Sequence, residues 1–214
     1  MSYKEYPDRE TWVRSFDNRI GASEIAIICG FANYKSPVDL WKEKTGRKKA
    51  DDISDDELVS YGKEAEQYLR ALFALKHRHK FDVDYHPYRV YYNDETPYLT
   101  ATLDGELIEK DTGRRGIYEC KTCLIQSRQA LESWHSQIPQ KYYCQVCQQL
   151  YTTGYYYAVV NAELRFMDGN AEIREYYIER ADIEDDIKYV VSQGSEWWNK
   201  YVTTDKAPPV TIRI

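Results

Sequence analysis

The chain has 214 residues, 43% hydrophobic and 30% charged, which is long enough to bury one substantial core. No apolar run approaches the roughly 18 residues that span a bilayer, and the polar N-terminal segment does not have the pattern of a signal peptide, so we expect a cytoplasmic protein. The net charge of −6 excludes a generally basic nucleic-acid-binding protein and confines any such binding to local basic patches. No linker divides the sequence, and we expect a single domain over residues 1–214.

The N-terminal segment predicts two short helices. Residues 8–18 form the first, and the segment RIGASEIAIICGF contains the second. Gly21 suits a tight turn and Ser23 an N-cap, with Arg19 close by. A helix N-terminus with free amides beside an arginine is suited to binding phosphate, although an ordinary cap explains the same residues.

A third helix is predicted between Ser36 and Gly46, with Pro37 in its first turn. The densest basic cluster of the sequence follows from its C-terminal half, at Lys42, Lys44, Arg47, Lys48 and Lys49. This cluster would suit a DNA backbone, but basic residues at a helix end also complement the helix dipole.

A long helix is predicted over residues 54–79, with Ser54 as its N-cap. Its apolar positions at helical spacing predict a core-facing stripe of Leu58, Ala65, Leu69, Leu72 and Phe73. Glu66 lies beside this stripe, where a carboxylate has to be paired, hydrated or bound to a metal. Residues 81–92 then predict an irregular strand that Pro87 interrupts.

A hairpin is predicted from residues 98–107 and 116–121. Asp104 would lie late in its first strand, and Glu119 and Lys121 would share one face of its second. Hard divalent cations prefer carboxylate oxygens, and a metal-bound water beside a lysine is a nucleophile for phosphodiester cleavage. The spacing D-x14-E-x-K is the core of the PD-(D/E)xK nuclease pattern. Taken alone, the triplet is more often a solvated hairpin with a salt bridge.

The C-terminal half alternates helices and strands. Helices are predicted over 127–134, 138–154 and 182–203, and strands over 155–164 and 171–179. In the second of these helices Gln145 belongs to a polar face of glutamines. The whole pattern predicts an α+β fold with a mixed sheet.

Four cysteines have a spacing that is found in zinc sites, Cys120-x2-Cys123 and Cys144-x2-Cys147. On a strand, however, Cys120 faces away from Glu119 and Lys121, and neither pair has the glycine of a zinc knuckle. Buried free thiols are favoured, and a zinc or iron-sulfur site is the alternative.

Four blocks in this order resemble the YqaJ-type viral recombinases, the phage lambda exonuclease family within the PD-(D/E)xK nuclease superfamily. The resemblance covers residues 12–162. The blocks are RIGASEIAIICGFANYKSPVDLWKEKTG, YGKEAEQYLRALF, YLTATLDGELIE with GIYECKT, and IPQKYYCQVCQQLYTTGYYYAVVN.

The resemblance implies a restriction-endonuclease-like fold and a Mg²⁺-dependent exonuclease, with Mn²⁺ as a substitute. Such an enzyme degrades linear double-stranded DNA 5′ to 3′ and leaves 3′ single strands for a phage annealing protein. The family's lambda-like members form ring-shaped homotrimers around DNA, an arrangement that would let an acidic subunit still present a basic inner channel.

The resemblance also implies roles for individual residues. Glu66, Asp104 and Glu119 would be metal ligands, and together with Lys121 they would be the catalytic set. Ser23 matches the serine that contacts the terminal 5′ phosphate in the family.

Gln145 matches a glutamine near the active site, and Arg19 is a candidate DNA contact. The arginine that usually follows the family's tryptophan by four positions is Phe16 here, which leaves Arg19 or Arg14 as substitutes. Thr100 to Leu103 stand where relatives often have Ser-Pro, a change that should alter the turn more than the chemistry.

Two other functions use the same residues differently. An endonuclease would use the same metal site, and a catalytically silent DNA- or protein-binding phage module would keep only the fold. The intact carboxylates and lysine argue against the silent module.

Overall fold

The computed structural model describes residues 2–32, 34–51 and 55–210. The strands in these ranges are β1 (Ser2–Glu5), β2 (Ile20–Gly21), β3 (Phe81–Asp84), β4 (Arg89–Tyr92), β5 (Leu99–Ala101), β6 (Gly105–Glu109), β7 (Arg115–Ile125), β8 (Tyr157–Phe166) and β9 (Ala171–Glu179). The helices are α1 (Arg9–Arg14), α2 (Ile25–Ile28), α3 (Pro37–Lys44), α4 (Glu57–Lys76), α5 (Arg128–Glu132), α6 (Gln140–Thr153) and α7 (Glu184–Trp197). A 3-10 turn (Arg180–Asp182) precedes α7, and a π-helical turn (Trp198–Val202) follows it.

The larger sheet has five strands in the order β3-β6-β7-β8-β9. Strands β7 and β8 are parallel, and the other neighbouring pairs are antiparallel, so the sheet is mixed as predicted. Because parallel neighbours need a crossover connection, α5 and α6 lie between β7 and β8 in the sequence. The turn at Asp168 and Gly169 joins β8 to β9 as an antiparallel hairpin, and Gly169 has a positive φ of 87°.

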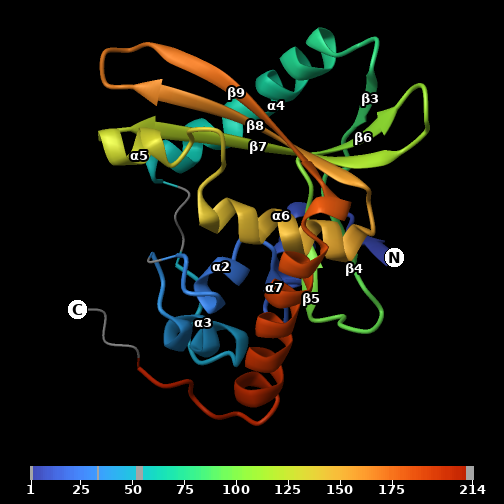
Figure 1. Cartoon of the computed structure of the whole chain (residues 1–214). Coiled ribbons are helices and arrows are strands. Elements are labelled where there is room, and N and C mark those ends of the chain that lie inside the picture. The colour runs from blue at the N-terminus through green and yellow to red at the C-terminus, as the bar shows by residue number, and fades with distance from the viewer. Residues whose placement is uncertain (1, 33, 52–54, 211–214) are drawn as a thin grey trace.

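Helices cover both faces of the larger sheet (Figure 1). Side chains alternate along a strand, so neighbouring residues enter different cores. Tyr118 and Val159 pack with Leu69 and Phe73 of α4. Ile117 and Val160 belong to the other, larger cluster, which contains residues of α2, α6 and α7.

The predicted first strand of the hairpin is divided between two sheets. β5 pairs with β4 and β2 in a four-stranded sheet of order β1-β4-β5-β2, whereas β6 pairs with β7 in the larger sheet. Asp104 therefore does not lie late in a strand: it lies in the short connection just before β6. The expected strand over 81–92 is divided in the same way, because Pro87 cannot donate a backbone hydrogen bond.

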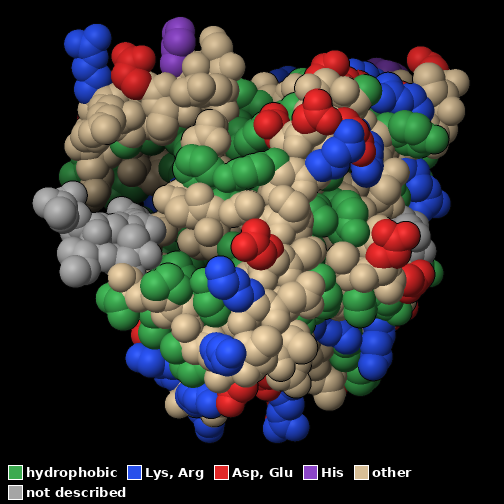
Figure 2. All heavy atoms as spheres, turned by 60° about the horizontal axis from the view of Figure 1, so that its bottom comes forward, with side chains coloured by type: hydrophobic (Ala, Val, Ile, Leu, Met, Phe, Trp, Pro, Cys, Tyr) green, Lys and Arg blue, Asp and Glu red, His purple; other side chains and the backbone are tan. Residues whose placement is uncertain are grey.

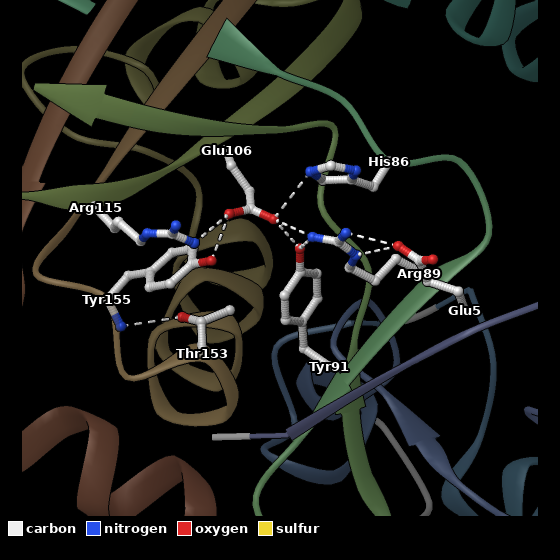
Figure 3. A network of polar contacts seen from close by, with 8 residues as sticks. All are labelled: Glu5, His86, Arg89, Tyr91, Glu106, Arg115, Thr153 and Tyr155. Atoms are coloured by element: carbon white, nitrogen blue, oxygen red, sulfur yellow. Dashed lines mark hydrogen bonds and ion pairs between the residues drawn. The ribbon is translucent and has the colours of Figure 1, made fainter. Parts of the chain in front are cut away.

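A buried carboxylate joins the two sheets beside this connection (Figure 3). Glu106 of β6 is 3% exposed. Its hydrogen-bonding partners come from β4, β7 and the turn after α6: Arg89, Tyr91, Arg115 and Tyr155. Burial favours the neutral acid, but hydrogen bonds from Tyr155 and Tyr91 and the charge of Arg89 outweigh it and lower the pKa of Glu106. The network fixes the backbone two residues after Asp104.

The predicted helix ends are confirmed in part. Ser36 caps α3 by accepting the N–H of Asp39, and Gly46 follows with a positive φ of 72°. Ser23 is not an N-cap, because Glu24 precedes α2 and no side chain caps that helix. Instead, Oε2 of Glu24 accepts the N–H of Gly21 at 2.9 Å.

Two details of the predicted long helix are corrected. Asp56 caps α4 by accepting the N–H groups of Leu58 and Val59, while the predicted cap Ser54 lies outside the described residues. Leu58 and Leu72 are about half exposed and do not belong to the core-facing stripe, which holds Leu69 and Phe73.

The basic cluster at the C-terminal end of α3 is not a continuous cationic surface. Lys44 is buried and pairs with Glu24 at 2.8 Å. Three others are also ion-paired, in the pairs Lys42–Asp39, Arg47–Asp205 and Lys48–Asp51. Figure 2, which brings the α3 end of the molecule forward, shows basic side chains mixed with acidic and apolar ones.

In the part of the chain that the structure describes, no helix is both long and apolar enough to cross a membrane.

Candidate active site

A cavity of about 340 Å³ lies where α4, α6, β7 and the connection before β6 meet. Five of the residues singled out in the sequence line this catalytic cavity: Glu66, Asp104, Glu119, Lys121 and Gln145. Three carboxylates, an ammonium group and an amide from four separate segments therefore face one space.

Strand β7 supplies Glu119 and Lys121 on one face, because residues two apart on a strand point the same way. Nζ of Lys121 donates to Oε1 of Glu119 across 2.5 Å, and Glu119 is 2% exposed. The ammonium group also lies 5.0 Å from the ring centre of Tyr142. The lysine is thus held against the carboxylate by both an ion pair and an aromatic face.

Helix α6 orients the same carboxylate through two glutamines four residues apart. Nε2 of Gln145 donates to Oε1 of Glu119 at 2.6 Å. Nε2 of Gln149 donates to Oε2 at 2.5 Å and to the carbonyl oxygen of Thr102 at 3.1 Å. Gln149 was not predicted as a site residue, although its spacing from Gln145 could have identified it.

Helix α4 brings Glu66 to the cavity through a close approach to β7. A Cβ atom at Gly62 would lie 3.1 Å from Oγ1 of Thr122, which is closer than an ordinary van der Waals contact, so glycine suits this close approach. Arg70 lies one helical turn after Glu66. Its Nη1 atom donates to Oε1 of Glu66 at 3.0 Å and to the carbonyl oxygen of Asp104 at 2.8 Å. Arg70 was missed in the sequence, where its only signal is its position four residues after Glu66.

The cavity concentrates negative charge. Burial, followed by the charges of Glu119 and Glu66, raises the pKa of Asp104 well above its ordinary value. Burial also raises the pKa of Glu66, despite the nearby Arg70. Burial opposes charge on Lys121, but Glu119 and Asp104 outweigh it and raise the pKa of the lysine. The negative forms of Asp104 and Glu66 are therefore costly, although the positive Lys121 lies beside them. A bound cation would lower that cost.

The donor set fits a hard divalent cation, because buried carboxylate oxygens are the ligands that Mg²⁺ prefers. Among the described residues, no group of three or more His, Cys, Asp or Glu side chains has the close spacing of a ready-made metal site. Both oxygens of Glu119 are engaged by Lys121, Gln145 and Gln149. The cavity therefore fits a divalent cation in the type and the charge of its donor atoms.

Two of the three predicted DNA-binding residues line an adjoining cavity of about 270 Å³. Ser23 and Gln145 line it, and Gln145 faces the catalytic cavity as well. Phe16 also lines this second cavity, as an apolar ring at the position where the family usually has arginine.

The two candidate arginines are placed differently. Arg19 is not among the residues that line either cavity, but its Nη1 atom is buried without a hydrogen-bond partner within the described residues. An unpaired cationic donor of this kind is suited to an anion. Arg14 pairs with Glu10 on the exposed surface of α1.

The four cysteines do not gather into one site in the described structure. Cys120 packs in the cluster under α4, whereas Cys144 and Cys147 belong to the larger cluster around α6. Cys123 lies 3.5 Å from the hydroxyl of Tyr142. All of these thiols are free.

Comparison with known proteins gives a family and a fold. A family model described as "YqaJ-like viral recombinase domain" matches residues 11–156. The "Uncharacterized protein YqaJ" of Bacillus subtilis (strain 168) is 28% identical over 205 residues. That match covers 94% of this chain and 58% of the relative, so the chain spans little more than half the length of the relative.

Solved structures of exonucleases share the fold. The alkaline exonuclease LHK-Exo of Laribacter hongkongensis has a TM-score of 0.60 at 15% identity, covering 92% of this chain and 97% of that one. LHK-Exo in complex with dAMP gives 0.59 at 15%, over 92% and 98%. A phage related exonuclease from Haemophilus somnus 129PT gives 0.54 at 12%, over 88% and 96%. These similarities confirm the predicted α+β, restriction-endonuclease-like fold.

Proposed function

Because this chain belongs to the family of YqaJ-like viral recombinase domains, we propose that it is a metal-dependent deoxyribonuclease that degrades linear double-stranded DNA from its 5′ ends. The observation that carries the proposal is the convergence of Glu66, Asp104, Glu119 and Lys121 on one cavity. The fold that holds them is shared with proteins described as exonucleases.

Asp104 and Glu119, with Glu66, would hold the cation, which we propose to be Mg²⁺ with Mn²⁺ as a substitute. When bound, such a cation supplies an activated water and neutralises charge on the phosphate. The raised pKa of Asp104 supports this assignment, since its carboxylate is costly to keep charged without a cation.

Lys121 acts as a charged donor. Its ammonium group already donates to Glu119, and an ammonium group has no lone pair with which to accept a proton. Lys121 therefore orients the attacking water and offsets the charge that grows on the phosphate oxygens. Gln145 and Gln149 hold the carboxylate of Glu119 in place during the attack of the water.

The 5′ polarity is supported by the cavity next to the catalytic one. Ser23 lines it, and the Nη1 atom of Arg19, four residues earlier in the chain, has no hydrogen-bond partner among the described residues. We propose that both contact the terminal phosphate. The product would be a 3′ single strand, which we propose passes to an annealing protein. We further propose a homotrimeric ring, which sedimentation velocity tests directly.

Digestion of DNA with defined ends tests the proposal. With Mg²⁺, linear duplex labelled at its 5′ ends should release labelled nucleotide at once, and duplex labelled at its 3′ ends should release it late. A 5′ phosphate should be degraded faster than a 5′ hydroxyl, and covalently closed circles should stay intact. Cutting of the circles would indicate the endonuclease instead, and no digestion of any substrate would contradict nuclease function.

A further inference from the structure

A third cavity, of about 420 Å³, adjoins the catalytic cavity at Glu66. It shares Glu66 and Lys63 with the catalytic cavity, and it shares Trp12 with the cavity at Ser23. Its remaining walls come from α1, α4 and the segment between β3 and β4. We call it the aromatic cavity, after Trp12, Tyr85 and Tyr88.

The charge of the aromatic cavity is opposite to that of the whole chain. Arg9, Lys63 and Arg70 line it together with a single carboxylate, that of Glu66. Arg70 pairs with Glu66, whereas Arg9 and Lys63 form no ion pair with any described residue. Two uncompensated cations in a protein of net charge −6 make this space attractive to an anion.

The aromatic side chains present open faces and an unused donor. The guanidinium of Arg70 lies 3.7 Å from the ring centre of Tyr85, yet Tyr85 remains 44% exposed. Trp12 lies 6.0 Å from Tyr88 at a tilt of 55°, and its indole Nε1 is buried without an acceptor in the described structure.

The backbone at Tyr88 is strained. Its φ of +64° is unusual for a bulky residue and costs free energy that the surrounding structure has to compensate. Tyr88, held in this conformation, lies beside Trp12 in the lining of the cavity. Strained residues of this kind are concentrated at binding sites.

These features together select a ligand. Aromatic rings alone would suit a cation, but the three basic side chains repel one. A planar group that stacks on the rings and carries a negative charge meets both requirements, and nucleotides have both parts. We infer that the aromatic cavity binds one nucleotide of single-stranded DNA beside the catalytic cavity, with its base on Tyr85 and its phosphate near Arg9 and Lys63. This inference rests on the proposed nuclease function.

Two ligands carry the same base and phosphate: a nucleotide within a continuous DNA strand, and a released mononucleotide. Glu66 and Lys63 line both cavities, so a continuous strand that occupies both would meet these two side chains. Binding of an oligonucleotide and binding of free dAMP distinguish these sources.

Binding without metal tests the inference, since no cleavage is then needed. The probes are a fluorescein-labelled oligothymidylate of about 12 nucleotides, followed by anisotropy in EDTA, and dAMP, followed by calorimetry. Tyr85→Ala should weaken binding about tenfold, and Tyr85→Phe, which keeps the ring, should bind as the wild type does. Arg9→Ala should weaken binding and reduce its dependence on salt by about one charge.

Matched controls lie outside the cavity. Tyr68→Ala changes an exposed tyrosine on the outer face of α4, and Arg128→Ala changes an exposed arginine of α5. Both should leave binding within about twofold of the wild type. Binding of the oligonucleotide alone assigns the site to a continuous strand, and additional binding of dAMP that Tyr85→Ala weakens assigns it to the product as well.

The inference is overturned if Tyr85→Ala, shown to be folded by circular dichroism, binds both probes as Tyr68→Ala does, or if neither probe binds the wild type. Failure of the nuclease proposal would look different. The wild type would then bind single strands in EDTA and still release no nucleotide when Mg²⁺ is added.

Discussion

The side-chain amide of Gln145 donates a hydrogen bond across 2.6 Å to Oε1 of Glu119, which lies 26 residues earlier in the chain. Gln149 holds the other oxygen of the same carboxylate. Helix α6 thus fixes the orientation of a β7 carboxylate before any ligand binds, which is the preorganisation that a catalytic site requires.

Replacing Gln149 with leucine should damage both stability and activity. The change leaves Oε2 of Glu119 and the carbonyl of Thr102 without their amide donor in a fully buried site. An unsatisfied buried polar group costs about 1–3 kcal/mol, and urea unfolding should show a loss in that range. Gln140→Leu, on the exposed first turn of the same helix, is the control, and equal stability of the two variants would contradict this role.

Mg²⁺ should stabilise the wild type but not Asp104→Asn. Burial and the charges of Glu119 and Glu66 make a negative Asp104 costly, and a bound cation removes that cost. At about 100 times its Kd, Mg²⁺ should raise the melting temperature by roughly 5–11 °C. Differential scanning fluorimetry measures the shift, with Na⁺ at equal ionic strength as the control. An equal shift in Asp104→Asn would place the cation elsewhere.

Arg70→Lys should lower activity with little change in the fold. One Nη atom of Arg70 contacts both Glu66 and the carbonyl of Asp104, and a lysine keeps the charge without the planar fork. Loss of a residue that orients metal ligands costs about 10–100-fold in activity or metal affinity. Titration of activity with Mg²⁺ separates the two effects. Arg78→Lys, an exposed change just beyond α4, should behave as the wild type does.

The contribution of Glu106 should depend on pH. Its folded pKa lies below its unfolded value, so its stabilisation is present above about pH 4.5 and is lost as the pH falls through the folded pKa. Glu106→Gln removes a buried charge that Arg89 needs and should cost about 3 kcal/mol at pH 7. Urea unfolding at pH 7 and pH 4 should show this difference shrinking at the lower pH. A difference that does not change with pH would contradict the ionic role.

Local patterns predicted much of the structure. The two-residue spacing of Glu119 and Lys121 placed them on one face of β7, and helical spacing placed Gln145 on the polar side of α6. Cap and turn residues located the ends of α3, because their backbone preferences are local.

Long-range pairing could not be predicted in this way. Ile20 of β2 pairs with Leu99 of β5 across almost 80 residues, and this pairing draws the chain out of one sheet just before Asp104. β2 has two residues, too few to show a strand period. Arg70 and Gln149 were missed for a related reason, since their roles depend on which side chains of other elements they meet.

The most direct test of the catalytic cavity is the release of acid-soluble nucleotides from linear duplex DNA in Mg²⁺ by the wild type, Asp104→Asn and Lys121→Ala. We predict that each variant, shown to be folded by circular dichroism, loses activity by at least about 100-fold. Degradation at the wild-type rate by either folded variant would contradict the assignment of this cavity as the active site.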